Sequence, residues 1–158
     1  MSVHFILDGY NIVKQTKFIN STTLKAGREG LLSFIENYHP QGSFKNKVTI
    51  VFDGKKDINI KLCSSIPEVI FTKGETADAY IKRIVEKVAF PKNVVVVTND
   101  RELEFFVRRS GAKIMSVNEF LLKAKINKSK DLEQTLELPS YVSDKITSEL
   151  KQLWLKDR

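Results

Sequence analysis

Apolar residues occur along the chain in short continuous runs and in longer stretches where they recur every three or four positions. The short runs predict buried strands and the longer stretches predict amphipathic helices. The expected strands are 3–7, 47–52, 68–71, 94–98 and 113–115, and the expected helices are 24–38, 76–89, 101–110 and 117–124. This alternation of strand and helix predicts an α/β fold with a mostly parallel sheet and helices on both faces.

The run 94–98 is the most apolar in the chain. Continuous β-branched runs belong in the middle of parallel sheets covered on both faces, so we place this strand centrally, beside 3–7. The helix 101–110 should end at Gly111, and the helix 117–124 should be capped by Ser116. The residues expected to face inward from the helix 76–89 are Ala79, Tyr80, Ile84, Val85 and Val88.

The C-terminal part of the chain differs in character. Residues 125–140 are polar, contain Pro139 and lack a clear period, which favours a linker. A final amphipathic helix is expected at about 141–156, with Val142, Ile146, Leu150, Leu153 and Trp154 along one side. That side must be covered, either by the rest of the chain or by a partner. We therefore expect one folded domain at 1–125, followed by a linker and helix at 126–158.

Length and composition are those of a globular domain. A chain of 158 residues that is 42% hydrophobic can bury one core. No apolar stretch approaches the roughly 20 residues that cross a bilayer, and Met1 leads into a strand without a signal-peptide pattern, so we expect a cytoplasmic protein. The single cysteine, Cys63, excludes an intramolecular disulfide and a cysteine metal cluster.

The charge balance indicates a polyanionic partner. The chain has 26 Lys and Arg residues against 19 Asp and Glu, a net charge of +7. A basic protein whose acids are clustered has a still more basic remaining surface, which favours nucleic acid as a partner. The alternative is that the excess of lysine only maintains solubility.

Four aspartates follow or adjoin the expected strands: Asp8, Asp53, Asp78 and Asp100. In an open α/β sheet the carboxyl ends of the strands share one edge, where ligands bind. Two unit charges 4 Å apart repel by roughly 4 kcal/mol at an effective dielectric near 20, so converging carboxylates need a cation. Hard divalent ions meet that need, and we predict a Mg²⁺ or Mn²⁺ site.

Three of these acids also have a structural explanation. An Asp-Gly pair after a strand, as at Asp8 and Asp53, is typical of a turn. Asp78 lies in the first turn of an expected helix capped by Thr76, where the helix dipole favours a negative charge. Asp100 directly follows the most apolar strand, where a functional role is the stronger interpretation.

Polar neighbours of these acids are candidates for a supporting role. Asn11 can reach back toward Asp8, and Glu75 adds a second acid beside the helix start. Thr98 and Asn99 place a hydroxyl and an amide next to Asp100, where they can bind a metal-bound water. None of these neighbours specifies a metal site by itself.

Taken together, the motifs resemble a known family. Leu-Asp-Gly-Tyr-Asn at 7–11, Val-Phe-Asp-Gly at 51–54, Phe-Thr-Lys-Gly-Glu-Thr-Ala-Asp-Ala-Tyr-Ile at 71–81 and Val-Thr-Asn-Asp at 97–100 are similar, in order and spacing, to the YacP-like NYN domains of the PIN-like nuclease superfamily. The resemblance covers about residues 3–125. It implies a three-layer sandwich and an RNA endonuclease with a divalent-metal site, and related bacterial members act on messenger RNA in association with the ribosome.

The resemblance also implies roles for single residues. Asp8, Asp78 and Asp100 would be the principal metal carboxylates, and Asp53 an outer or fourth acid. Asn11, Thr98 and Asn99 would be supporting groups, and Glu75 is a further supporting candidate from its position beside Asp78 rather than from the resemblance. The chain departs from the family pattern at 101–104, where Arg-Glu-Leu-Glu replaces a segment that usually carries a glutamine.

Basic residues near the expected edge are candidates for RNA phosphate contacts. They are Lys14, Lys17, Arg28, Lys55, Lys56, Lys73, Lys82, Arg101, Arg108 and Arg109. Tyr10 is a candidate for stacking on a base. The alternative for those on helices is an ordinary solvated outer face, and His4 and His39 are expected to be structural.

The leading hypothesis is a metal-dependent endoribonuclease. One alternative is a non-catalytic RNA- or ribosome-binding module with the same fold. A mononucleotide-binding domain is disfavoured, because neither a Gly-x-Gly-x-x-Gly nor a Walker loop follows the first strand.

Overall fold

The computed structural model describes residues 2–15, 24–54 and 67–136. Within these ranges the strands are β1 (His4–Asp8), β2 (Lys47–Asp53), β3 (Glu68–Thr72), β4 (Val94–Val97) and β5 (Lys113–Met115). The α-helices are α1 (Gly9–Gln15), α2 (Leu24–Tyr38), α3 (Ala77–Lys87), α4 (Arg101–Arg109) and α5 (Val117–Leu136), and a short 3₁₀ turn, Pro91–Asn93, precedes β4. Each strand expected from the sequence is present, with ends that differ by one residue at most.

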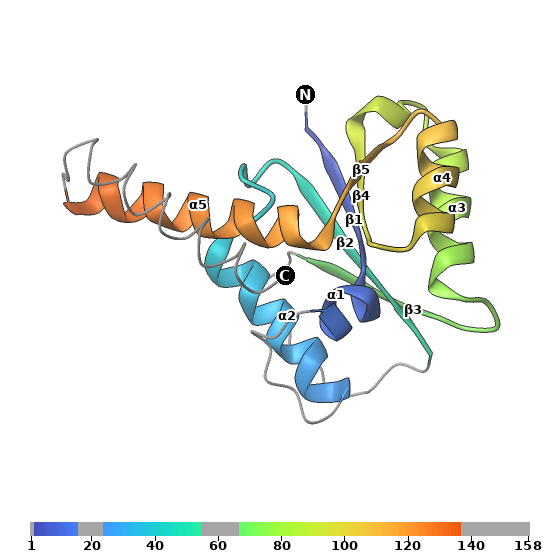
Figure 1. Ribbon diagram of the computed structural model, residues 1–158, viewed down its shortest axis with the longest axis horizontal. Helices are drawn as coiled ribbons and strands as arrows, with labels where there is room; N and C mark the ends of the chain where they lie inside the picture. Colours follow the sequence, from blue (N-terminus) through green and yellow to red (C-terminus); the bar gives the residue numbers. More distant parts are fainter. Residues whose placement is uncertain (1, 16–23, 55–66, 137–158) are drawn as a thin grey trace.

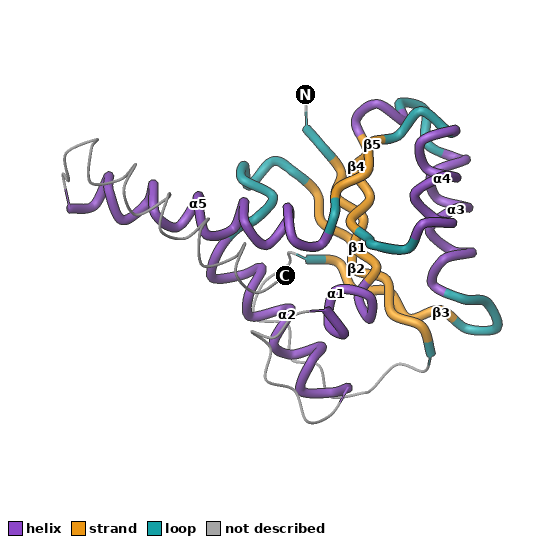
Figure 2. Tube along the Cα trace, viewed as in Figure 1, coloured by secondary structure: helices purple, strands orange, loops and turns teal. Residues whose placement is uncertain are grey.

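The five strands form one sheet in the order β3-β2-β1-β4-β5, and every strand pairing is parallel. β4 lies beside β1 in the interior of the sheet, as its continuous apolar sequence predicts. Helices cover both faces, so the fold is the expected three-layer α/β sandwich, with the sheet running between two groups of helices (Figures 1 and 2).

Successive side chains of each strand point to opposite faces, which divides the core in two. On β1, Phe5 and Leu7 pack in a cluster with α1, α2 and α5, whereas Ile6 packs in a second cluster with α3 and α4. Figure 1 shows the same division, with α3 and α4 together on one side of the sheet and the other three helices on the opposite side.

The capping predictions for the later helices are confirmed. Gly111, with a φ of +86°, follows α4 in the left-handed conformation that ends many helices. Ser116 accepts a hydrogen bond from the Glu119 backbone N–H (3.2 Å) at the start of α5.

The inward face of α3 was predicted only in part. Ala77, Ile81 and Val85 are its buried residues, and Tyr80, Ile84 and Val88 pack against them. Ala79 is exposed, so its predicted inward position is wrong. The helix starts at Ala77, and the buried stripe follows that residue at intervals of four.

The linker prediction is wrong for residues 125–136, because α5 continues through them to Leu136. Over residues 117–127, the part of α5 whose burial is described, the buried positions are Val117, Phe120, Leu121 and Ala124, and the helix then continues beyond the sheet (Figure 1). Beyond that point the sequence still contains no Gly or Pro before Pro139, and nothing in it breaks a helix. Asn127 attaches α5 to the end of α2 by donating its side-chain N–H to the His39 carbonyl (3.0 Å).

Several predictions fall outside the described residues, namely the C-terminal helix at 141–156, Pro139 and Cys63. Among the helices that the structure describes, none is long and apolar enough to cross a lipid bilayer.

Candidate functional site

The parallel sheet brings the predicted acids to one edge. Asp8 is the last residue of β1 and Asp53 the last of β2. Asp100 follows β4 after two residues, and Asp78 is the second residue of α3, the helix that follows β3. Because all four strands run in the same direction, their carboxyl ends meet on the same side, as expected.

Asp8 is the buried member of this group, with an exposed fraction of 7%. Its Oδ2 accepts a hydrogen bond from the hydroxyl of Thr98 (3.3 Å). Burial, and then the negative charges of Asp78 and Asp100, raise the pKa of Asp8 to about 6, against the lowering effect of hydrogen bonds from Thr98 and from the Asn11 backbone. Asp8, Asp78 and Asp100 therefore lie within electrostatic reach of one another.

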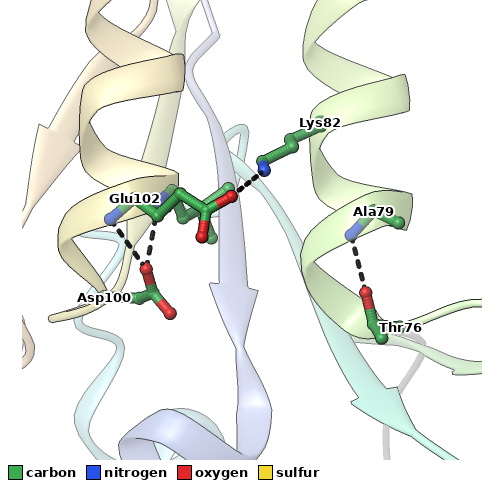
Figure 3. A network of polar contacts seen from close by, with 6 residues as sticks. Thr76, Ala79, Lys82, Asp100 and Glu102 are labelled. Carbon is green, nitrogen blue, oxygen red and sulfur yellow. Dashed lines mark hydrogen bonds and ion pairs between the residues drawn. The ribbon is translucent and has the colours of Figure 1, made fainter.

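The Thr98 hydroxyl joins two of these acids. Thr98 is 2% exposed and, besides donating to Asp8, accepts a hydrogen bond from the Asp100 backbone N–H (3.1 Å). The Asp100 carboxylate in turn caps α4, since its Oδ1 accepts from the backbone N–H groups of Glu102 (2.9 Å) and Leu103 (3.1 Å) (Figure 3). One buried hydroxyl thus fixes the end of β4 against the end of β1.

Asp78 lies in the first turn of α3, which Thr76 caps by accepting a hydrogen bond from the Ala79 N–H (3.1 Å) (Figure 3). Burial is the largest cause that raises the pKa of Asp78, followed by repulsion from Asp100. Asp53 and Glu102 add smaller repulsions and Lys82 opposes them.

Sequence reasoning missed the contribution of Glu102. This residue is the second of α4, two positions after Asp100, and forms an ion pair with Lys82 of α3, with an N–O distance of 3.2 Å (Figure 3). Its position two residues after an N-cap aspartate is the signal that could have indicated it, because a residue in the first turn of α4 stays close to the cap.

The two asparagines hold the backbone rather than the acids. The Asn11 side-chain oxygen accepts from the Asn99 backbone N–H (2.9 Å), so the side chain faces Asn99 and not Asp8 as predicted. The Asn99 side chain accepts from the Val117 N–H (3.0 Å) and donates to Gln15. Both groups of the Asn99 amide are engaged, and they connect the end of β4 to α1 and α5. The predicted contact of Asn99 with a metal-bound water therefore has no support in this geometry.

Glu75 also has a structural partner. It lies just before α3 and forms an ion pair with Arg83 of that helix, with an N–O distance of 2.7 Å. It lines an open hollow of about 820 Å³ beside the acidic group. The residues around this hollow are Asp53, Gly54, Thr72, Lys73, Gly74, Glu75 and Thr76. Asp53 therefore faces this hollow as well as contributing to the field at Asp78.

Two predicted RNA contacts are part of the packing. Arg28 is only 6% exposed, donates a hydrogen bond to the Tyr10 hydroxyl (2.8 Å) and lies over the Phe71 ring, 5.7 Å from its centroid. The Tyr10 ring packs against that of Phe52, with 5.1 Å between centroids. A phosphate contact by Arg28 and base stacking by Tyr10 are both at odds with these positions, because the guanidinium is buried and the tyrosine ring packs against Phe52.

Most of the other predicted RNA contacts that the structure describes are exposed, whereas Lys82 is half-buried and paired with Glu102. Lys14, Lys73 and Arg101 lie at the surface, and Arg108 does too, although it pairs with Glu104 (2.9 Å). Lys17, Lys55 and Lys56 are outside the described residues.

The two histidines have structural contacts. The His4 ring is hydrogen-bonded to the Thr49 hydroxyl (2.8 Å), and the His39 ring packs edge-on against Phe44.

The two Asp-Gly pairs differ in their backbone. Gly54 has a φ of +113°, which is the turn conformation that the sequence predicts. Gly9 instead begins α1, so the turn expected there is wrong. A Cβ at Gly9 would lie 2.5 Å from Cδ1 of Phe52 and 3.0 Å from Cζ, so this glycine is required by close approach of the helix to a buried ring.

The donors suit a hard divalent ion in their chemistry. Asp8, Asp78 and Asp100 offer oxygen ligands, and their mutual repulsion is the kind that a cation relieves. In the described part of the chain, however, no three His, Cys, Asp or Glu side chains are grouped closely enough to surround one ion. The three carboxylates approach one another without forming a finished coordination sphere.

The raised pKa of Asp8 has a consequence for stability. The folded state binds this proton more tightly than the unfolded chain, whose aspartates titrate near pH 3.9. The free energy of unfolding should therefore fall as the pH rises from about 4 to about 6 and stay lower above that. Asp8→Asn should remove this loss and be more stable by up to about 3 kcal/mol at pH 7.5, with little difference below pH 4.

Urea unfolding without divalent ions, at a series of pH values, measures this effect. Glu86→Gln, which alters an exposed carboxylate of α3, is the matched control and should follow the wild type. If the free energy of unfolding of Asp8→Asn varies with pH in parallel with that of the wild type, the charged form of Asp8 is not disfavoured by its surroundings.

A parallel five-stranded α/β sandwich with acids at its carboxyl edge is the architecture of a nuclease-type domain. The family model for the YacP-like NYN domain matches residues 5–157, and the chain belongs to that family. The match extends well beyond residue 125, where the resemblance noted in the motifs ends.

Two solved structures are similar over almost the whole chain, both of Rae1 (YacP) from Bacillus subtilis. A mutant form has 25% sequence identity to this chain and a TM-score of 0.68, and the match covers 98% of this chain and 91% of the Rae1 chain. The second has 25% identity and a TM-score of 0.66, covering 99% and 92%. No curated protein sequence matches this chain.

Proposed function

We propose that this protein is a divalent-metal-dependent endoribonuclease that hydrolyses RNA phosphodiester bonds at the carboxyl edge of its sheet. The observation that supports this most strongly is the placement of Asp8, which is buried, bound to Thr98 and within electrostatic reach of Asp78 and Asp100. Such an arrangement is costly without a cation, and phosphodiester hydrolysis is a reaction that carboxylate-held metal ions promote.

In this proposal Asp8, Asp78 and Asp100 would hold Mg²⁺ or Mn²⁺. When bound, the metal supplies an activated water and stabilises negative charge on the phosphoryl oxygens. Thr98 keeps Asp8 and Asp100 in register, and Asn99 holds that segment against α1 and α5.

Groups around the hollow would meet the substrate. Lys73 is exposed there and can contact a phosphate, and Asp53 is an outer acid beside the same space. The net charge of +7 favours a polyanionic substrate. We propose that this substrate is messenger RNA and that the protein cleaves it in the cytoplasm, in association with the ribosome.

A second candidate function is a non-catalytic RNA- or ribosome-binding module. It is favoured by one observation, the absence of a finished three-ligand cluster in the described part of the chain. In that case the acids would act only as helix caps and first-turn charges, which Asp78 and Asp100 also are.

Incubation of the purified protein with a labelled messenger RNA, with Mg²⁺, with Mn²⁺ or with a chelator, separates the two candidates. We expect internal cleavage that requires the metal and stops with the chelator. Binding of the RNA without cleavage under any of these conditions would instead support the binding module.

A further inference from the structure

The outer face of α4 carries a line of cationic and aromatic side chains. Arg101, Phe105, Arg108 and Arg109 are all exposed and lie at positions i, i+4, i+7 and i+8 of the helix, so they share one side of it. We call these four residues the α4 stripe.

Phe105 is the unusual member, because its exposed fraction is 65%. On its other side α4 packs against the core through Leu103 and Val107, which are fully buried. The guanidinium of Arg109 lies 5.8 Å from the centroid of the Phe105 ring, a cation–π contact that leaves part of the ring open to solvent. The fold therefore does not explain this aromatic side chain.

The charges on the stripe are unbalanced. The two acids of α4, Glu102 and Glu104, are paired with Lys82 and Arg108. Among the described residues, Arg101 and Arg109 have no carboxylate partner. Two unpaired guanidinium groups on either side of an open aromatic ring are complementary to a strand that carries both phosphates and bases.

The stripe begins at the candidate metal centre. Asp100 is the N-cap of α4, and at 1.5 Å per residue Phe105 lies roughly 8 Å further along the helix axis and Arg109 roughly 13 Å. With bases stacked about 3.4 Å apart along one strand, these distances correspond to only a few nucleotides. Figure 1 shows α4 on the outer side of the sheet, next to α3, with its outward side uncovered by other described segments.

We propose that the α4 stripe binds single-stranded RNA where the strand leaves the acidic centre, with a base stacked on Phe105 and phosphates held by Arg101 and Arg109. This rests on the proposed function, since it takes the substrate to be RNA. The α4 stripe would determine the affinity for RNA, whereas the roles proposed for the carboxylates stay the same.

Binding can be measured apart from cleavage. The full-length protein is titrated into a fluorescently labelled 12-nucleotide RNA in the presence of a chelator, and anisotropy gives Kd. Stacking of one base contributes about 1–3 kcal/mol, so Phe105→Ala should weaken binding about 5- to 150-fold, and Phe105→Tyr should retain most of the affinity. Arg109→Gln should lower the slope of log Kd against log salt by about 0.7, the value for one phosphate on a single strand.

Phe44→Ala is the matched control, since Phe44 is 70% exposed and lies in the turn before β2, away from α4. It should bind RNA as the wild type does. If Phe105→Ala also binds as the wild type does, the inference is overturned and a protein partner becomes the better explanation of the stripe. If the wild type still cleaves RNA in a metal-dependent way, that result leaves the proposed function intact. The opposite outcome, RNA binding that depends on Phe105 but no cleavage under any condition, would overturn the nuclease assignment and leave the binding surface intact.

Discussion

Asp8→Asn is expected to slow RNA cleavage by on the order of 10²–10³-fold, although the same substitution stabilises the fold at neutral pH. The asparagine has nearly the same shape and keeps one side-chain oxygen, which can accept the hydrogen bond from Thr98, so the local packing should survive. What is lost is the negative charge that would hold the metal. A side chain whose removal increases stability and abolishes activity is one retained for function.

Asp100→Asn should reduce cleavage to a similar extent without unfolding α4. Asparagine is as good an N-cap as aspartate, so the hydrogen bonds from Glu102 and Leu103 to this position can be kept. Any loss of activity then reflects the charge and not the helix.

Single-turnover rates with saturating Mg²⁺ test both substitutions, with circular dichroism spectra to confirm folding. Glu86→Gln, on the exposed side of α3, should cleave at the wild-type rate. Equal rates for the wild type, Asp8→Asn and Asp100→Asn would remove the nuclease assignment.

Gly9→Ala is expected to destabilise the fold by about 1–3 kcal/mol, the range for overfilling a packed core. The added methyl group would lie 2.5 Å from Cδ1 of Phe52, a ring that is fully buried between Tyr10 and Phe71. The ring cannot move away without disturbing both neighbours. Alanine also favours a helix more than glycine does, which offsets part of the loss.

Urea unfolding of a double-mutant cycle isolates this contact. Phe52→Leu leaves a smaller side chain opposite position 9, so Gly9→Ala should cost less in that background than in the wild type. If Gly9→Ala is as stable as the wild type, or its cost is the same in both backgrounds, the close approach does not constrain the fold.

Strand positions could be predicted from the sequence because the pattern of burial is local. The run Val94–Val97 is buried on both faces, and its continuous β-branched sequence reflects this. α1 was missed because Gly9 was interpreted as a turn residue, whereas its role depends on Phe52, more than 40 positions away in the sequence. α5 was cut short because the sequence after Ala124 is polar and lacks a clear apolar period.

The candidate site shows the same division. The positions of the acids at strand ends follow from sequence, since topology brings parallel strand ends together. The partners of individual side chains do not follow. Arg28 was assigned to RNA on its charge alone, but its hydrogen bond to Tyr10 depends on how α1 and α2 pack. Asn99 was predicted to bind a metal-bound water, but its contacts are with α1 and α5.

The exposed aromatic on α4 illustrates a third case. In the sequence Leu103, Phe105, Phe106 and Val107 are all apolar, so the pattern alone does not show which of them face inward. Only the fold shows that Leu103 and Val107 take the inward positions and leave Phe105 at the surface. Which residues of α4 reach the surface depends on the orientation of the helix, and the local sequence pattern does not determine that orientation.

The central claim is that Asp8, Asp78 and Asp100 share a divalent ion. Crystals of the protein soaked in Mn²⁺, with anomalous diffraction collected to locate the metal, test it most directly. We expect an anomalous peak at the carboxyl edge of the sheet, at about 2.0–2.6 Å from carboxylate oxygens of Asp8 and of at least one of the other two. A fully soaked crystal without a peak there, with Asp100 still capping α4 and Asp8 bound only to Thr98 and the Asn11 backbone, would contradict the claim.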